Sequence, residues 1–458
     1  MPDIDAPNGA WKTEVVASPH DPAIASRFFA AYEKRPAAAD EELRAIYLQL
    51  KYFHDPDKAR WLGVLGGFFR ETGRPYLAAL CFLESVRLRP DRPEIYREYE
   101  RVRDRLEPAP YRGESGPGPK VSVIMATYDR GEGILESVRS VLGQTEQDFE
   151  LIVVDDGGKG CVEALLRGLG SPKIRCCRLP ENRGHAAALN EGIRRARGRY
   201  VAYLDDDDVY YPNHLEALLG TLRERGRAFA YSDTKMVSGG TVDGRFRADG
   251  VKGTWNFDFS RDMLVAGNFI ANLTVVHERS VFSEVGLFAE ELRVVMDWEL
   301  WLRAALSYDF ARLPEYTGEY RLRSDNITAR DRLRIDFHTE LVKAYYVHHR
   351  GAVAEVRYRS WKGDEEAARD GYSGIRNRYK AYFHSPDSFD ELLELAARYG
   401  DDAFAREMAV DYFRLNTRRF LKYVYRTGRY GLLVPVSRLM PGKVADAARK
   451  RLGKAGTR

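Results

Sequence analysis

Five short runs of β-forming residues recur between residues 121 and 232, and this alternation constrains the fold more than any other feature of the chain. They are VSVIMA (121–126), ELIVV (150–154), IRCCRL (174–179), YVAYL (200–204) and AFAYS (228–232). They alternate with helical patterns of about 10–15 residues. Apolar strands separated by helices predict an α/β domain with a mainly parallel, buried sheet flanked by helices.

The regions on both sides of this domain have helical periodicity. Residues 1–24 are polar, and we expect a flexible N-terminus there. Residues 25–107 have apolar residues at spacings of three and four, which predicts a helical domain. Residues 108–119 (PAPYRGESGPGP) are a Pro/Gly linker. The α/β domain is expected to span 120–330, and a helical C-terminal region follows in 331–458.

One stretch of the N-terminal helical region has the spacing of a tetratricopeptide repeat. Its characteristic positions are Leu65, Gly66, Phe69, Gly73, Ala78, Phe82, Ser85 and Pro90. Small residues at this spacing let two antiparallel helices pack closely. Because a single repeat does not build a solenoid, an ordinary helical hairpin is the alternative.

Composition excludes several classes of protein. The 458 residues are 44% hydrophobic and 31% charged, which is sufficient for folded cores. No run approaches the ~18 apolar residues of a membrane-spanning helix, and the first residues lack the pattern of a signal peptide. Four Cys residues are too few and too irregularly spaced for a disulfide framework or a zinc site. These features predict a cytoplasmic protein.

The charge of the chain is unevenly distributed. The formal net charge of +4 is not that of a nucleic-acid-binding protein. From Arg414 onward, however, the sequence contains thirteen Lys and Arg residues and a single acidic residue, Asp446. This basic tail carries +12, and the rest of the chain carries −8. Interleaved with the basic residues are Phe420, Tyr423, Tyr425, Tyr430, Leu432, Leu433 and Val434. Such a tail predicts peripheral attachment to an anionic membrane surface. The alternative is a solvated helix that packs on the acidic body or binds an anionic glycan.

Polar clusters follow three of the predicted strands. The clusters are Thr127-Tyr128-Asp129-Arg130, Asp155-Asp156-Gly157-Gly158 and Asp205-Asp206-Asp207-Asp208. In an open parallel sheet, ligands bind beyond the carboxyl ends of the strands. We therefore expect the three clusters to form one binding site.

The four adjacent carboxylates of Asp205–Asp208, the acidic run, predict a cation site. Like charges at a strand end repel one another and require a compensating cation. Oxygen ligands without Cys or His suit Mg²⁺ or Mn²⁺, which commonly keep positions open for a substrate's phosphates. The alternative is a solvated acidic turn that caps the helix beginning near Pro212.

The other clusters are consistent with nucleotide binding. Asp156 offers a carboxylate to a base N–H, whereas Tyr128 offers a stacking surface and Arg130 a phosphate contact. The segment 181–192 (ENRGHAAALNEG) enters a small-residue helix, whose N-terminus favours phosphate. The alternatives are an Asp helix cap, a packed tyrosine and a tightly packed Ala-rich helix.

A further acidic motif, MDWELWLR, spans residues 296–303. Asp297 lies beside Trp298, and partial desolvation there would raise the pKa of its carboxyl group, which suits a general base. The alternative is a simple helix cap.

The stretch from Lys120 to Arg323, about 45% of the chain, resembles the family 2 glycosyltransferases with the GT-A fold. Four motifs occur in the family's order: VSVIMATYDR, QDFELIVVDDGG, ENRGHAAALNEGIRRARGRYVAYLDDDDVYYPNHLE and DWELWLR. The resemblance implies an inverting, metal-dependent enzyme whose donor is a UDP-, dTDP- or GDP-linked sugar. It also implies a glycan or lipid-linked acceptor in bacterial surface polysaccharide synthesis.

Carried over to this chain, the resemblance assigns roles to individual residues. The nucleotide-sugar-binding residues would be Thr127, Tyr128, Arg130, Asp156, Asn182, Gly184, Asn190, Asp205 and Asp206. The resemblance makes Asp207 the ligand of Mn²⁺ or Mg²⁺, and it makes Asp297 the base that deprotonates the acceptor hydroxyl.

Three positions depart from the family's pattern. Gly158 replaces the usual Ser. Met296 replaces the Glu that commonly precedes the catalytic Asp, which leaves Glu299 as the candidate second carboxylate. Arg323 stands where His is frequent, and an extra Arg there would favour an anionic donor or acceptor, unless it forms an ordinary ion pair. Arg321, two residues earlier, is a candidate supporting residue.

Two other functions compete with sugar transfer. A nucleotidyltransferase would also bind a nucleotide and a metal at acidic strand ends, but it does not explain Asp297. A non-catalytic interaction protein built on a degenerate core does not explain why Asp156, Asp207 and Asp297 are all present.

Overall fold

The chain divides into two compact units. The computed structural model describes residues 10–33, 41–106, 111, 113, 117–160, 162–242, 245–323, 331–347, 352–378, 386–427, 429, 432 and 435–436. One unit comprises Met1–Leu88 and Pro93–Val342, and the other comprises Arg89–Arg92 and Lys343–Arg458. Within the described ranges, no helix is both long enough and apolar enough to cross a membrane.

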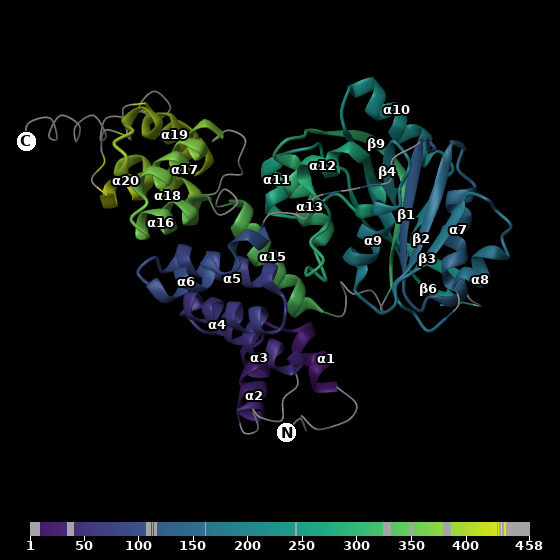
Figure 1. Cartoon of the computed structure of the whole chain (residues 1–458), viewed down its shortest axis with the longest axis horizontal. Helices are drawn as coiled ribbons and strands as arrows, with labels where there is room; N and C mark the ends of the chain where they lie inside the picture. Colours follow the sequence, from purple (N-terminus) through teal and green to yellow (C-terminus); the bar gives the residue numbers. More distant parts are fainter. Residues whose placement is uncertain are drawn as a thin grey trace, which may run out of the picture. The chain divides into compact units, whose positions relative to one another are not determined.

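A mixed sheet forms the centre of the first unit (Figure 1). Its nine strands, counted over the described residues, follow the order β3-β2-β1-β4-β8-β6-β9-β5, with β7 paired to β6. They are β1 (Val121–Thr127), β2 (Phe149–Asp155), β3 (Ile174–Arg178), β4 (Tyr200–Tyr203), β5 (Val209–Tyr210), β6 (Phe229–Val242), β7 (Arg245–Trp255), β8 (Val275–Glu278) and β9 (Phe310–Leu322). All five predicted strands are present.

The strands that precede the polar clusters pair in parallel. β3, β2, β1 and β4 run in the same direction, and the register aligns Thr127 with Asp155. Every residue of β1 and β2 is buried, as expected for strands covered on both faces. β8 is antiparallel to both β4 and β6, so the sheet becomes mixed beyond β4.

Helices cover the faces of the sheet. They are α7 (Ile134–Leu142), α8 (Val162–Arg167), α9 (His185–Arg194) and α10 (His214–Arg225). The small residues of α9 have a packing role, because a Cβ atom at Gly192 would lie 2.5 Å from Ile124 Cγ2. The tight packing that was the alternative for this helix is therefore present.

The N-terminal region is helical, as predicted for 25–107. Its helices are α1 (Ala10–Ala17), α2 (Pro22–Tyr32), α3 (Glu41–His54), α4 (Lys58–Glu71), α5 (Pro75–Leu88) and α6 (Pro93–Glu100). α4 and α5 form the predicted hairpin, and Gly66 permits it because a Cβ atom there would lie 2.6 Å from the Phe82 ring. The expectation of an unstructured N-terminus is wrong for α1, because Val15 and Val16 are buried in one apolar cluster with Phe28.

α15 (Arg332–Val347) begins the C-terminal helical region, and its first turns pack on the N-terminal helices. The Phe337 ring contacts the rings of Tyr52 and Phe69. The Tyr52 hydroxyl donates a hydrogen bond of 2.5 Å to Glu340. These contacts explain why the first unit extends to Val342, beyond the expected domain end at 330.

The second unit contains α16 (Ala352–Trp361), α17 (Glu365–Arg378), α18 (Pro386–Arg398), α19 (Asp402–Leu415) and α20 (Thr417–Thr427). Phe420, Tyr423 and Leu432 are buried in its apolar core. These side chains are therefore unavailable to a membrane surface, which corrects part of the expectation for the basic tail. The side chains of Tyr425, Tyr430, Leu433 and Val434, and the basic residues from Arg438 onward, lie outside the described residues.

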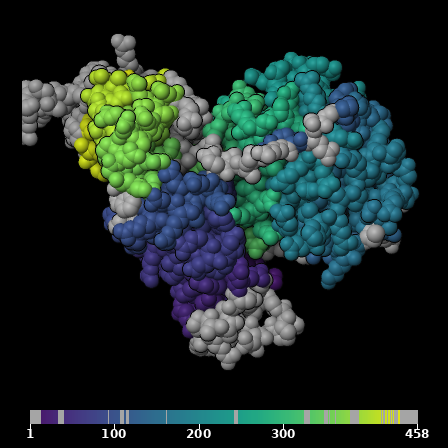
Figure 2. Space-filling model, in the orientation of Figure 1, coloured from purple at the N-terminus to yellow at the C-terminus, as the bar shows by residue number. Residues whose placement is uncertain are grey.

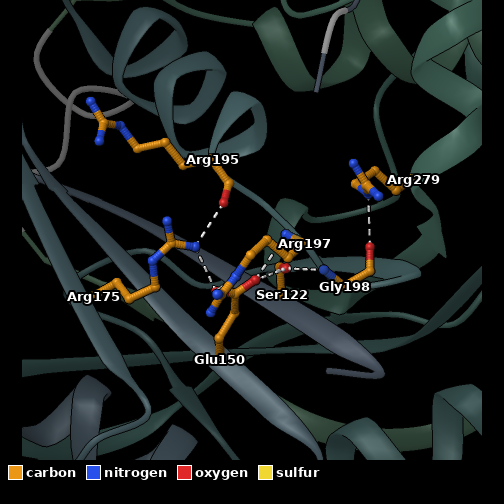
Figure 3. Close-up of polar contacts among 7 residues, drawn as sticks. All are labelled: Ser122, Glu150, Arg175, Arg195, Arg197, Gly198 and Arg279. Atoms are coloured by element: carbon orange, nitrogen blue, oxygen red, sulfur yellow. Dashed lines mark hydrogen bonds and ion pairs between the residues drawn. The ribbon is translucent and has the colours of Figure 1, made fainter. Parts of the chain in front are cut away.

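A buried carboxylate fixes the amino ends of β1, β2 and β4, opposite the acidic run (Figure 3). Glu150 accepts hydrogen bonds from Ser122 Oγ (2.8 Å), the Arg175 guanidinium (2.7 Å) and the Arg197 N–H (2.9 Å). Ser122 Oγ accepts another from the Gly198 N–H. Burial raises the pKa of Glu150, but these partners outweigh burial and hold the pKa below its usual value.

We expect Glu150→Gln to lower the free energy of unfolding by about 3 kcal/mol, because two arginines lose a buried charged partner. Glu163→Gln, which removes an exposed pair with Arg167, should cost less than about 0.5 kcal/mol. Since folding lowers the pKa of Glu150, the contribution of Glu150 to the free energy of unfolding is present above its pKa in the unfolded chain. This contribution is lost as the pH falls through its pKa in the folded protein. Urea unfolding at pH 7 and pH 4 measures both effects. Equal stability of the two variants would contradict the assignment.

Candidate active site

Two neighbouring strands end at the acidic run. Asp205–Asp208 follow β4, and Thr127 ends the adjacent β1. Thr127 Oγ1 donates a hydrogen bond to Asp206 (2.6 Å), and Arg130 donates to both Asp206 (2.9 Å) and Asp207 (2.7 Å). Two of the expected clusters therefore meet directly, and Arg130 offsets part of the negative charge.

His185, the first residue of α9, supplies a second positive charge. Its Nε2 lies 3.2 Å from Asp205 Oδ1. Burial alone would lower the pKa of His185, but Asp205, Asp206 and Asp297 outweigh burial and raise the pKa to about 9. The imidazole is therefore protonated at neutral pH. No sequence motif marks this role, because the partner of His185 lies 20 residues later in the chain.

The other acids of the run are less well compensated. Burial raises the pKa of Asp207 to about 6, with Asp206 and Asp205 adding to it and Arg130 opposing it. Burial, together with the charges of Asp207 and Asp205, raises the pKa of Asp208 well above its usual value. Asp208 Oδ1 accepts a hydrogen bond from the Arg321 N–H (2.7 Å), whereas its buried Oδ2 has no hydrogen-bond partner among the described residues. The site therefore holds excess negative charge, which favours a bound cation.

Asp297 lies at the start of α13 (Met296–Ala305), directly after a strained residue. Val295 has a φ of 55°, in the left-handed region that β-branched residues rarely adopt. Burial raises the pKa of Asp297 to about 6, and Asp205 contributes to this shift. The opposing contacts include a hydrogen bond that Asn268 Nδ2 donates to Asp297 Oδ2 (3.1 Å). A carboxyl group with this pKa exchanges protons near neutral pH and suits a general base.

Glu299 is not a second carboxylate of the site. It is 2% exposed, and both of its oxygens accept hydrogen bonds from Arg303 (2.5 and 3.0 Å). Arg303 also donates to the backbone carbonyl of Leu287 (2.9 Å). The expectation for Glu299 is therefore wrong, because its position four residues before Arg303 places it in a buried structural ion pair.

Asp156 and the loop before α9 form the other side of the site. The Asp156 carboxylate accepts hydrogen bonds from the backbone N–H groups of Arg183 and Gly184, each at 2.8 Å. Gly157 has a φ of 74°, and a Cβ atom there would lie 2.4 Å from the carbonyl carbon of Glu181. Tyr128 is 48% exposed, so it is not a packed core tyrosine. Its ring is open to a stacking partner, and Asn182 is exposed as well.

Asn190 is occupied by packing contacts. It is 1% exposed, its amide donates to the Phe288 carbonyl (2.9 Å) and to Glu290 (3.1 Å), and its oxygen accepts from the Phe288 N–H (3.0 Å). These bonds use the donors of the side-chain amide. The expected contact of Asn190 with the donor is therefore contradicted, and its role is to hold the loop at Phe288 against α9.

Two arginines approach the acidic run from the end of β9. Arg321 pairs with Glu136 (2.9 Å), and its guanidinium lies 4.5 Å from the centre of the Phe246 ring. The Arg323 guanidinium lies 5.3 Å from the same ring and acts to lower the pKa of Asp207. Arg321 therefore forms an ordinary ion pair, and Arg323 lies within electrostatic reach of the run.

The acidic run has the chemistry of a site for a hard divalent cation that is completed by substrate. Among the described residues, no group of three or more His, Cys, Asp or Glu side chains is arranged to hold a metal ion. Mg²⁺ and Mn²⁺ are, however, commonly held by one or two carboxylates together with substrate phosphates. The unsatisfied Oδ2 of Asp208 and the raised pKa of Asp207 fit such an ion.

The α/β part of the chain matches known proteins. Residues 122–274 match the model of the protein family described as Glycosyl transferase family 2. The chain is 30% identical over 198 residues to the uncharacterized glycosyltransferase YwdF of Bacillus subtilis (strain 168), which covers 43% of this chain and 71% of YwdF. It is 31% identical over 216 residues to TuaG of the same strain, a glycosyltransferase provisionally named for teichuronic acid biosynthesis. That match covers 46% of this chain and 82% of TuaG.

A similarity to a solved structure is weaker. The S. aureus TarS 1–349 structure in complex with UDP-GlcNAc has 18% sequence identity and a TM-score of 0.41. The match covers 68% of this chain and 92% of the TarS chain.

We expect Asp207→Asn to stabilise the ligand-free protein. Folding raises the pKa of Asp207 to about 6, so ionisation of its carboxyl group lowers the free energy of unfolding. This decrease in stability grows as the pH rises from about 4 to 6. Neutral Asn should raise the free energy of unfolding at pH 7.5 by on the order of 2 kcal/mol. Asp258→Asn, at a side chain 91% exposed, should change it by less than about 0.5 kcal/mol. Chemical denaturation measures both, and a stability loss in Asp207→Asn would contradict the excess of negative charge.

Proposed function

The chain belongs to glycosyltransferase family 2, and we propose that it moves a sugar from a nucleotide-diphosphate donor to a hydroxyl group of a glycan or lipid-linked acceptor. It is a transferase with the GT-A fold. The observation that carries the proposal is electrostatic: His185, whose Nε2 lies 3.2 Å from Asp205 Oδ1, also interacts with Asp297, so the cation site and the candidate base are close together. Membership of the family removes the nucleotidyltransferase alternative.

The donor would bind at the ends of β1 and β2. The exposed ring of Tyr128 would stack on the nucleobase, beside Thr127, and Asp156 would accept a hydrogen bond from a base N–H. The carboxylate of Asp156 has lone pairs beyond the two that Arg183 and Gly184 use. Asn182, which is exposed in the loop before α9, would lie at the edge of this site. A UDP-, dTDP- or GDP-linked sugar would satisfy these contacts.

The diphosphate would meet both positive and negative groups of the site. Asp207 would hold Mn²⁺ or Mg²⁺ together with the diphosphate, with Asp205 and Asp206 beside it. Bound there, the ion would neutralise charge on the leaving group. Arg130 and protonated His185 already pair with these carboxylates. If a bound cation took over the carboxylates, both side chains could contact phosphate oxygens instead.

Asp297 would act as the general base of an inverting transfer. Its carboxylate would take the proton of the acceptor hydroxyl as that oxygen bonds to the anomeric carbon. The bond between this carbon and the diphosphate oxygen would break at the same time, on the opposite face of the sugar. Because Glu299 is sequestered by Arg303, Asp297 would act without a second carboxylate.

The product would be a bacterial surface polysaccharide. The likeness to TuaG, with its provisional assignment to teichuronic acid biosynthesis, supports this part of the proposal. Peripheral attachment to the cytoplasmic face of the membrane would rest on the charge of the basic tail, since Phe420 and Tyr423 are buried.

Asp297→Asn should reduce kcat by at least about 100-fold, which is the lower range of a general-base contribution. Donor binding should be unchanged, because Asn keeps the shape of the side chain and its contact with Asn268. Asp262→Asn, an exposed acid on α11 (Arg261–Ala266), is the control and should retain full activity. Steady-state kinetics and donor calorimetry measure the two effects. Turnover retained by Asp297→Asn would remove the base assignment.

Donor binding should depend on a divalent cation and on Asp207. We expect EDTA and Asp207→Ala each to weaken the binding of a nucleoside diphosphate by at least about tenfold, or ~1.4 kcal/mol, because each removes the ion's bridge to phosphate. Isothermal titration calorimetry with Mn²⁺ measures this loss. Binding indifferent to both changes would show that transfer does not use a metal.

A further inference from the structure

A cavity of about 1270 Å³ lies within the first unit, away from the strand ends. Its wall comes from α1, α3, the turn between α4 and α5, residues 290–293 and the first turns of α15. Figure 2 shows the purple and blue surface of these N-terminal helices. Sites for drug-sized ligands commonly measure about 300–1,000 Å³. This cavity therefore has room for a larger ligand, such as several linked sugars.

The chemistry of the cavity wall suits an uncharged, hydroxyl-rich ligand. Five acidic and three arginine side chains line it together with the amide of Gln49 and the apolar surfaces of Phe69 and Leu77. Carboxylates accept hydrogen bonds from sugar hydroxyls, and guanidinium groups donate to them. The excess of acidic side chains opposes an anionic ligand. The lining therefore favours a neutral or amino-bearing oligosaccharide.

His338 adds an unsatisfied hydrogen-bonding group to this wall. Burial lowers its pKa to about 3, so the ring is neutral, and it has a hydrogen bond with the backbone of Val294. Its Nδ1 is buried with no hydrogen-bond partner in the described part of the chain. Because the other ring nitrogen is already used, Nδ1 is an acceptor enclosed by the protein just behind the cavity wall.

Residues 290–293 join the cavity to the active site. On the cavity side, the Glu291 carboxylate accepts hydrogen bonds from the backbone N–H groups of Tyr76 (3.0 Å) and Leu77 (2.9 Å) at the start of α5. On the other side, the Arg293 guanidinium fills the space beside Gly184, where a Cβ atom would lie 2.1 Å from it. The same short segment therefore contacts the N-terminal helices and the loop that binds Asp156.

The candidate base follows the cavity wall closely along the chain. Arg293 and Asp297 are four residues apart, so their Cα atoms are separated by at most about 14 Å. A chain of a few linked sugars that lies in the cavity can bridge this distance.

We propose that this cavity binds the acceptor, a neutral or amino-bearing oligosaccharide, with its terminal hydroxyl directed to Asp297. The inference rests on the proposed sugar transfer, which makes the bound glycan an acceptor. It gives the N-terminal helices a role in acceptor selection, and it makes Glu291 and Arg293 the residues that hold the acceptor site against the donor site.

The test uses the full chain and an array of bacterial oligosaccharides with neutral, amino-bearing and uronic acid chains. Ala45→Trp fills the cavity from α3, and Val64→Trp is the control, at a residue of α4 that is 41% exposed and outside the lining. We expect wild type and Val64→Trp to bind neutral or amino-bearing chains, and Ala45→Trp to lose at least about tenfold in affinity. Gln49→Leu removes an amide of similar size and provides a second variant if Ala45→Trp does not fold.

Three results would overturn the inference: equal binding by the cavity variants, a preference for uronic acid chains, or no glycan binding by wild type. Nucleoside diphosphate calorimetry on the same proteins separates this failure from that of the proposed function. If the proposed function fails, wild type binds no nucleotide. If only the cavity assignment fails, nucleotide binding is intact while glycan binding is not affected by Ala45→Trp.

Discussion

Concentrated negative charge at the carboxyl end of β4 is the constraint on which the rest of the active site depends. β4 places Asp205–Asp208 next to the end of β1, where Arg130 and His185 offset only part of the charge. Burial, together with the uncompensated part of this charge, raises the pKa of Asp207 and Asp208, and Asp205 adds to the burial that raises the pKa of Asp297. Such an arrangement costs stability, and this cost is typical of sites kept for function.

A second set of contacts places the base relative to this charge. Glu291 caps α5, Arg293 packs against Gly184, and Val295 adopts a strained backbone conformation immediately before α13. These contacts connect the N-terminal helices to the segment that immediately precedes Asp297. Strain of this kind persists only where surrounding contacts over-determine the conformation.

The sequence allowed the strands and the meeting of their polar ends to be predicted, because both follow from local periodicity and from the direction of parallel strands. It did not allow the pairing of distant residues to be predicted. His185 has no local signal for its contact with Asp205. Glu299 and Asn190 fit a binding role in the motif, but Arg303 and the loop at Phe288 use their polar groups. Similarly, α1 is too weakly amphipathic to be recognised without Phe28, against which it packs.

The most direct measurement of the central claim is thermal denaturation of the full chain with UDP, dTDP and GDP in the presence of Mn²⁺. A ligand that binds only the folded state raises its stability by mass action. We predict that one of the three nucleotides raises the Tm of wild type and that the increase is lost without Mn²⁺ and in Asp207→Ala. A Tm that none of the three nucleotides changes, or an equal increase in Asp207→Ala, would contradict a nucleotide-sugar site at the acidic run.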